Sequence, residues 1–337
     1  MPKQTHILVI RLSAMGDVAM TIPVLRALIH QYPEVKITVL TREFFTPFFR
    51  DLSGVEVFSA EVNGKHKGLL GLYKLAKTLN IKNFDCVADL HDVLRSKILR
   101  RLVHADKYAV IDKGRKDKKA LISGKQFQPL KSTHERYADV FRALGFPLNL
   151  GNPVFPKKAS LSDVTKPFIS KTKKNIGVAP FATYEGKMYP LELMKKVIEE
   201  LASNYHVILF GGGSKEKAIL EDFERQFKHV VNVVGKLDLR DELDLISNLD
   251  VMLSMDSGNA HMAAMYGVKV VTIWGVTHPY AGFTPFNQPE NHALLPDRVQ
   301  FPMIPTSVYG NKYPEAYKKA SGSILPHDIV SKVKAII

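Results

Sequence analysis

Residues 251–275 read VMLSMDSGNAHMAAMYGVKVVTIWG, and this stretch decides the fold class. Two apolar runs, Val251–Met255 and Val268–Trp274, flank a polar turn and a helix over Ala260–Tyr266. Near-continuous apolar strands are typical of a parallel sheet that is covered on both faces. Ligands of such sheets bind beyond the carboxyl ends of the strands, where helix N-termini begin. The turn Asp256–Asn259 lies at that position and is a candidate phosphate site.

Two interpretations of this turn stay open on the segment alone. In the first, the backbone N–H groups of Ser257, Gly258 and Asn259 bind a phosphate, and His261 on the first helical turn faces the same anion. In the second, Asp256 or Ser257 only caps the helix, since Asp and Ser are preferred N-caps. His261 is then an ordinary helix residue.

Composition indicates a large soluble protein. The 337 residues suffice for two domains of about 150–170 residues each; 45% of them are hydrophobic and 24% are charged. No apolar run approaches the ~20 residues of a membrane span, and residues 1–17 lack the features of a signal peptide. Cys86 is the single cysteine, which excludes an intrachain disulfide. We therefore expect a cytoplasmic protein.

The positive charge is concentrated in the first half of the chain. Residues 1–174 contain 31 Lys and Arg against 15 Asp and Glu, whereas residues 175–337 contain 16 against 18. This asymmetry predicts an anionic partner for the first half, although scattered lysines can also form an idle basic surface. The run Lys113–Lys119 (KGRKDKK) has five cations in seven residues. No aromatic side chains are interleaved with it, which disfavours nucleic-acid binding.

Strands and helices alternate along both halves. In the first half we expect strands over 7–12, 36–41, 55–58, 85–90 and 108–111, helices over 20–31, 69–79, 93–102 and 133–144, and a basic loop over 112–131. The pattern resumes after the irregular segment 145–174 and ends in a helix over 324–337. Such alternation predicts two doubly wound α/β domains with a cleft between them, divided near residue 160.

The first predicted strand is followed by the loop Arg11–Asp17 (RLSAMGD), in which Gly16 permits a tight turn. A carboxylate at Asp17 suits a general base that takes a proton from a hydroxyl nucleophile. Asp17 could equally cap the helix that follows.

The second half carries further candidates. Thr183 and Lys187 follow the strand 175–180, and a lysine there can neutralise a departing diphosphate, or be one more solvated lysine. The turn Gly211–Ser214 matches neither the dinucleotide nor the P-loop pattern. Glu216 after it could bind ribose hydroxyls or simply favour the start of a helix.

Several chemistries find no motif in the sequence. No two aspartates are separated by a single residue, no His/Cys metal cluster is evident, and no G-x-S-x-G elbow is present. We expect a mechanism without metal and without a bound cofactor.

Four segments together resemble glycosyltransferase family 9, the bacterial ADP-heptose:lipopolysaccharide heptosyltransferases. They are RLSAMGDVAMTIP, FATYEGKMYP, GGGSKE and SMDSGNAHMAA, in family order over nearly the whole chain. The resemblance implies the GT-B architecture, with two Rossmann-like domains facing each other across a cleft. Residues 1–160 would bind the acceptor and residues 161–323 the nucleotide sugar. The helix 324–337 would pack back on the first domain.

The resemblance also implies roles for individual residues. Asp17 matches the catalytic base of these inverting enzymes, Thr183 and Lys187 match donor-phosphate ligands, and Glu216 matches the ribose ligand. The remaining donor contacts match Asp256, Ser257, Gly258 and His261. The segment His134–Tyr137 also follows a family pattern.

The sequence departs from the family at two points. His278 stands where the family has an acid, and the cysteines of some members are absent from 301–312.

We therefore expect a metal-independent inverting glycosyltransferase that moves a sugar, a heptose of ADP-heptose by the resemblance, onto a lipopolysaccharide core. The acceptor would be an anionic, lipid-linked oligosaccharide, reached by peripheral contact with the inner face of the cytoplasmic membrane. Candidate acceptor contacts are Arg11, Arg95, Arg115, Lys116, Lys118 and Lys119. A sugar-nucleotide epimerase is an alternative, but it needs no basic acceptor surface. A periplasmic-type sugar-binding protein is another, and the missing signal peptide argues against it.

Overall fold

The computed structural model describes residues 4–337, which form two compact units. Unit 1 comprises residues up to 113 and 133–154, and unit 2 comprises 114–132 and 155–337. The predicted division near residue 160 is therefore wrong in one main respect, because the segment 114–132 belongs to unit 2. Its Phe127 ring packs against His278 and Tyr280, and its Leu130 N–H donates to the Tyr280 carbonyl at 2.9 Å.

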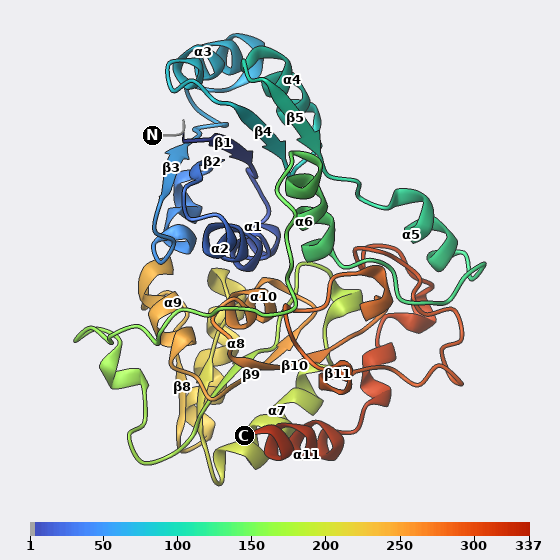
Figure 1. Cartoon of the computed structure of the whole chain (residues 1–337). Coiled ribbons are helices and arrows are strands. Elements are labelled where there is room, and N and C mark those ends of the chain that lie inside the picture. The colour runs from blue at the N-terminus through green and yellow to red at the C-terminus, as the bar shows by residue number, and fades with distance from the viewer. Residues whose placement is uncertain (1–3) are drawn as a thin grey trace. The chain divides into compact units, whose positions relative to one another are not determined.

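Unit 1 contains a five-stranded parallel sheet in the order β3-β2-β1-β4-β5 (Figure 1). The strands are β1 (His6–Ile10), β2 (Lys36–Thr41), β3 (Val55–Ser59), β4 (Cys86–Asp89) and β5 (Lys107–Val110). The helices are α1 (Met15–Ala19), α2 (Thr21–Gln31), α3 (Gly68–Asn80), α4 (Leu94–Leu102) and α6 (Thr133–Ala143). Central β1 is buried along its whole length, because helices cover both faces of the sheet. Leu8 and Ile10 share a core cluster with apolar residues of α3 and α4.

Unit 2 contains a six-stranded parallel sheet in the order β11-β10-β9-β6-β7-β8. The strands are β6 (Asn175–Ala179), β7 (His206–Leu209), β8 (Val230–Asn232), β9 (Val251–Met255), β10 (Lys269–Ile273) and β11 (Ala293–Leu294). The helices are α5 (Arg115–Ile122), α7 (Leu191–Ala202), α8 (Gly213–Gln226), α9 (Leu239–Ser247), α10 (Gly258–Ala264) and α11 (Pro326–Ile336). β9 and β10 pair in parallel, with Val251 opposite Lys269, as the opening stretch predicts.

The C-terminal helix packs within unit 2. Ile329, Val330 and Val333 of α11 are buried in the same core cluster as the apolar face of α7 and the strands β9 and β10. The helix was expected to pack back on the first domain; its apolar face is covered within unit 2. None of the helices between residues 4 and 337 combines the length and apolarity that a membrane span requires.

Each sheet has one point at which the strand order reverses, and open α/β sheets bind their ligands there. In unit 1 the chain runs outward from β1 to β3 and then returns to the other side of β1 as β4. In unit 2 it runs outward from β6 to β8 and returns beside β6 as β9. The loops after β1 and β4, and those after β6 and β9, are therefore where functional side chains are expected.

Candidate active site

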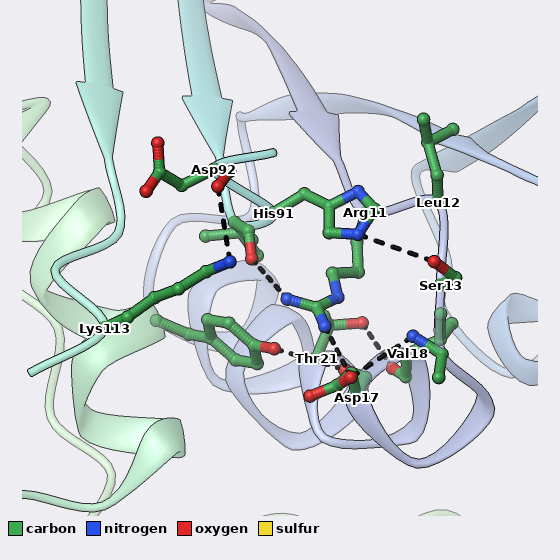
Figure 2. A network of polar contacts seen from close by, with 12 residues as sticks. Arg11, Leu12, Ser13, Asp17, Val18, Thr21, His91, Asp92 and Lys113 are labelled. Atoms are coloured by element: carbon green, nitrogen blue, oxygen red, sulfur yellow. Dashed lines mark hydrogen bonds and ion pairs between the residues drawn. The ribbon is translucent and has the colours of Figure 1, made fainter. Parts of the chain in front are cut away.

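An ion pair lies at the reversal point of unit 1, in the loop after β1. Arg11 Nη2 is 2.6 Å from Asp17 Oδ2, and the arginine side chain is 7% exposed against 31% for the aspartate (Figure 2). The cation is thus buried behind the carboxylate, which faces outward. At this site the protein presents a negative charge.

Arg11 is fixed in place from three sides. Its Nη1 donates to the Leu90 carbonyl at 2.7 Å, and its guanidinium lies 5.8 Å from the centre of the Tyr137 ring. Tyr137 in turn donates to the Asp17 carbonyl at 3.4 Å, and complete burial raises the pKa of its phenol. Arg11 was also expected to contact the acceptor. Its guanidinium is buried and pairs with Asp17, and the acceptor contact stays a prediction.

Asp17 is the third residue of α1 and is not the N-cap residue, which is Ala14. Its Oδ2 accepts from the Ala14 N–H at 3.2 Å, so the carboxylate does help to close the first turn. Within residues 4–337, no group donates a hydrogen bond to Oδ1. Oδ2 is therefore held by the protein, whereas Oδ1 accepts no hydrogen bond from the described residues.

His91 joins this site from the loop after β4, and the sequence interpretation missed it. Its Nε2 lies 3.5 Å from the Ser13 hydroxyl. Burial, followed by the charges of Arg11 and Lys113, lowers the pKa of His91 to about 4, so the ring is neutral at pH 7. Arg95, in the first turn of α4, is near enough to contribute to the same shift. The signal was available, since His91 directly follows the carboxyl end of an apolar strand.

A second ion pair lies at the reversal point of unit 2. Lys187, after β6, has its Nζ 2.7 Å from Asp256 Oδ2, after β9. The Thr277 hydroxyl donates to the same oxygen at 2.9 Å. The aspartate side chain is 6% exposed and the lysine 16% exposed. The order of burial is therefore the reverse of that in unit 1, with the anion inside and the cation nearer the surface.

Close backbone packing holds Lys187 at this place. The residue lies in the short helical turn Glu185–Lys187, whose Gly186 carbonyl accepts from the Val276 N–H at 2.7 Å. A Cβ on Gly275 would lie within 2.0 Å of that carbonyl oxygen, so only glycine fits there. Gly310, at φ +81°, packs directly on the Lys187 side chain.

The turn before α10 is not capped by a side chain. Ser257 is its N-cap residue, but the Ser257 hydroxyl lies 3.0 Å from that of Ser254, and Asp256 is committed to Lys187 and Thr277. The alternative that Asp256 or Ser257 only caps the helix is therefore wrong. Gly258 is the first residue of α10, and His261 is buried within it. With seven residues, α10 has a small dipole.

Thr183 precedes Lys187 in the chain, and Glu216 lies between Lys187 and Asp256. Thr183 is exposed at the start of the loop after β6. Glu216 Oε2 accepts from the Gly212 N–H at 2.7 Å, so one carboxylate oxygen closes its own turn at the start of α8. The predicted role of Glu216 toward ribose hydroxyls would fall to its other oxygen.

His278 does not take the place of an exposed acid. It is buried, and its Nδ1 accepts from the Tyr280 N–H at 3.1 Å. Burial, with the nearby charge of Arg298, lowers the pKa of His278 to about 4. The side chain therefore shapes the loop 278–281 as a neutral acceptor.

The expected basic loop is in part a helix. Arg115, Lys116 and Lys119 of α5 are exposed, whereas Lys118 is buried with its Nζ 4.1 Å from the centre of the Phe283 ring. The acceptor role of Lys118 stays a prediction, for a side chain that is buried here. Helical spacing turns one cation of the run inward while the others face solvent.

In the described part of the chain, no three His, Cys, Asp and Glu side chains gather in an arrangement suited to a metal ion.

Comparison with known proteins identifies the family. The model of glycosyltransferase family 9 (heptosyltransferase) matches residues 72–302, about two thirds of the chain. The lipopolysaccharide core heptosyltransferase OpsX of Haemophilus influenzae is 25% identical over 84% of this chain and 82% of its own length. Lipopolysaccharide heptosyltransferase 3 of Escherichia coli is 25% identical over 78% of this chain and 80% of its own.

Solved structures share the fold of the whole chain. A family 9 glycosyltransferase from Veillonella parvula superposes with a TM-score of 0.77 at 18% identity, over 100% of this chain and 98% of that one. The structure of E. coli ADP-heptose lps heptosyltransferase II superposes with a TM-score of 0.71 at 19% identity, over 98% of each chain. The predicted two-domain GT-B fold is confirmed. The chain belongs to glycosyltransferase family 9, a family of heptosyltransferases.

Proposed function

We propose that this enzyme transfers a heptose from ADP-heptose to the core of lipopolysaccharide, with inversion at the anomeric carbon and without a metal ion or bound cofactor. Family membership and the names of the relatives, which are lipopolysaccharide and lipooligosaccharide heptosyltransferases, support the donor and the acceptor. One observation carries the mechanism: Asp17 is held by one oxygen while the other accepts no hydrogen bond from residues 4–337.

In this mechanism Asp17 Oδ1 takes the proton of an acceptor hydroxyl. The freed oxygen attacks the anomeric carbon on the face opposite the diphosphate. A new C–O bond forms there while the bond to the diphosphate oxygen breaks, and ADP departs with that electron pair. Arg11 keeps the carboxylate oriented throughout, because its own position is fixed by Leu90 and Tyr137.

Lys187 would neutralise the negative charge on the departing ADP. Its ammonium is the outward member of the pair with Asp256, and a compact cation suits a diphosphate. Asp256 and Thr277 would hold the lysine in place and offer oxygens to the sugar. Thr183, Ser257, Gly258 and His261 would complete the donor site, and the second oxygen of Glu216 would accept from ribose.

The acceptor would meet the outward cations. Arg95 and Lys113 lie around His91 in unit 1, and Arg115, Lys116 and Lys119 are exposed on α5 of unit 2. The neutral His91 ring is suited to an acceptor hydroxyl, since it repels no cation beside it. A lipid-linked acceptor implies work at the inner face of the cytoplasmic membrane, held there through these cations.

The test is a reconstituted reaction of the purified enzyme with ADP-heptose and heptose-free core acceptor, followed by mass spectrometry and by NMR of the product's anomeric carbon. We expect a gain of one heptose, inverted configuration and unchanged turnover in EDTA. Retention of configuration, or loss of turnover in EDTA that Mg²⁺ restores, would overturn the mechanism. Transfer from another nucleotide sugar only would overturn the donor assignment.

A further inference from the structure

The outward face of α3 in unit 1 exposes large apolar side chains. Leu69, Leu70, Tyr73 and Ile81, the C-cap residue of the helix, are between 59% and 80% exposed. Leu94, at the start of the neighbouring helix α4, is 76% exposed. Single exposed apolar residues are common in soluble proteins, whereas a group of them on one helix face is typical of a surface that contacts a partner.

These exposed side chains are not needed to hold α3 in the fold. The opposite face of the helix, with Leu72, Leu75 and Leu79, is buried in the core cluster that also contains apolar residues of β1 and α4. The start of the helix is fixed as well, because a Cβ on Gly71 would lie 2.5 Å from the backbone of His66. α3 is therefore apolar on two opposite sides, and unit 1 covers only one of them.

Lysines lie among the exposed apolar side chains. Leu70, Lys74, Lys77 and Ile81 follow one another at spacings of four, three and four residues, which places them on one helix face. Both lysines are exposed, and within residues 4–337 neither pairs with an acid. We define the α3 surface as Leu69, Leu70, Tyr73, Lys74, Lys77 and Ile81.

The surroundings of the α3 surface have the same sign of charge. Between Glu61 and Asp85 the sequence contains five lysines and no acid. Glu61 itself pairs with Lys65. The neighbouring helix α4 contains three arginines and one lysine, and it also lacks an acid. The α3 surface is thus both apolar and cationic, which restricts the kind of partner that fits it.

We propose that the α3 surface binds an anionic lipid bilayer. The boundary between headgroups and acyl chains takes up the apolar side chains of a helix that lies in its plane, while anionic headgroups attract the lysines. The aliphatic part of a lysine also packs along apolar surface and lets the ammonium reach the headgroups. A second copy of the chain is disfavoured, because it would bring lysines against lysines. Nucleic acid is disfavoured because its phosphates would face Leu69, Leu70 and Ile81.

The position of the α3 surface in unit 1 fits this partner. α3 follows β3 and α4 follows β4, so both helices begin beyond the carboxyl ends of parallel strands. Leu69, Leu70 and Leu94 therefore lie toward the edge of the sheet that also carries the Asp17 loop, and α3 packs beside α4 (Figure 1). This inference goes beyond the proposed function, since α3 carries none of the donor or acceptor residues and lipid binding needs neither substrate.

Flotation of the full chain with lipid vesicles tests the proposal. We expect binding to vesicles of phosphatidylcholine and phosphatidylglycerol, and little binding to vesicles of phosphatidylcholine alone. The double variant Lys74→Ser/Lys77→Ser should bind about 25-fold more weakly at low salt, from about fivefold for each lysine. At high salt the loss should shrink, because exposed charges are screened. Leu70→Ser/Ile81→Ser should bind about tenfold more weakly at either salt, because burial of apolar area is not screened.

The matched control is Lys196→Ser/Val299→Ser in unit 2, which removes an exposed lysine and an apolar side chain that is 90% exposed. It should bind vesicles as the parent does. A dye locates the contact, because Cys86 is the single cysteine and is buried. A polarity-sensitive thiol dye at Leu70→Cys should shift its emission to the blue when anionic vesicles are added, and the same dye at Val299→Cys should not.

Three results would overturn the proposal. They are a parent chain that does not bind anionic vesicles, α3 variants that bind them as tightly as the parent, and sedimentation velocity showing that the α3 surface holds two copies together. Transfer to a delipidated core acceptor is measured in parallel and should be the same in the parent and in the α3 variants. Absence of transfer in all of them would contradict the proposed function and leave the result on lipid binding standing.

Discussion

The two reversal points contain the same kind of pair with opposite orientation. In unit 1, Arg11 is buried and Asp17 faces outward, whereas in unit 2 Asp256 is buried and Lys187 lies nearer the surface. Both pairs are close to 2.7 Å, so the difference is not one of bond length. It is a difference in which charge the protein offers to a ligand.

We propose that this difference divides the chemistry between the two units. An outward carboxylate can receive a proton, and an outward ammonium can receive an anion. The choice of cation follows the same logic, since arginine has several donors for fixing a carboxylate and lysine is a compact charge on a flexible stem. Unit 1 is therefore suited to activating the acceptor, and unit 2 to releasing the diphosphate.

The largest effect is expected from Asp17→Asn. The amide can still accept from the Ala14 N–H but cannot act as a base, so kcat should fall on the order of 10²–10⁴-fold. The matched control is Asp328→Asn, because Asp328 is also the third residue of its helix and is exposed. Steady-state kinetics on both variants checks this, and an active Asp17→Asn enzyme would mean that the base lies elsewhere.

Breaking the pair in unit 2 should chiefly cost stability. Lys187→Met leaves Asp256 buried without its cation, which typically costs about 3–5 kcal/mol of unfolding free energy. The exposed pair Lys174–Asp250 is the control, and Lys174→Met should cost no more than about 1 kcal/mol.

Denaturant titration measures both variants. Adding Asp256→Asn to Lys187→Met removes the unpaired charge and should recover most of the loss. If Lys187→Met and Lys174→Met lower the free energy of unfolding equally, the buried pair stabilises the protein no more than the surface pair does.

Acid should weaken unit 1 through His91. The pKa of His91 is about 4 in the folded protein against 6.5 as the ordinary value, so the unfolded chain binds more protons between these limits. Stability is then lost as the pH falls from about 6.5 toward 4, and this side chain accounts for about 2 kcal/mol between pH 7 and pH 5.

His91→Gln should flatten the pH dependence of the unfolding free energy over this range. His104→Gln, at an exposed histidine, should leave it unchanged. A variant at residue 91 that retains the full acid sensitivity would contradict the assigned cause.

The smallest effect concerns α5. Replacing Arg115, Lys116 and Lys119 with Ser should raise the acceptor KM a few-fold at low salt and little at high salt, because exposed charges are screened. Lys118→Ser should instead lower the melting temperature, since its side chain packs on Phe283. If the triple variant has an unchanged acceptor KM at low salt, the exposed cations of α5 have no role in acceptor binding.

Much of the fold followed from the sequence, because long apolar strands and amphipathic helices carry strong periodic signals. Lys187 and Asp256 were both expected at the donor site, but their ion pair was not predicted, because they are far apart in the chain and meet through the order β9-β6. The burial of Lys118 and the packing of 114–132 within unit 2 were not predicted. In a run of charged residues, the sequence does not show which side of the helix is buried. The partners of the apolar face of α11 within unit 2 could not be predicted, because an apolar face shows that a helix packs and not what it packs against.

We propose that the outward carboxylate serves the acceptor and the outward ammonium serves the diphosphate. Calorimetric titration of ADP tests this division most directly. We predict that Asp17→Asn binds ADP with the parental affinity, while Lys187→Met binds it on the order of tenfold more weakly or worse. Equal affinity in both variants, or a loss confined to Asp17→Asn, would contradict the account.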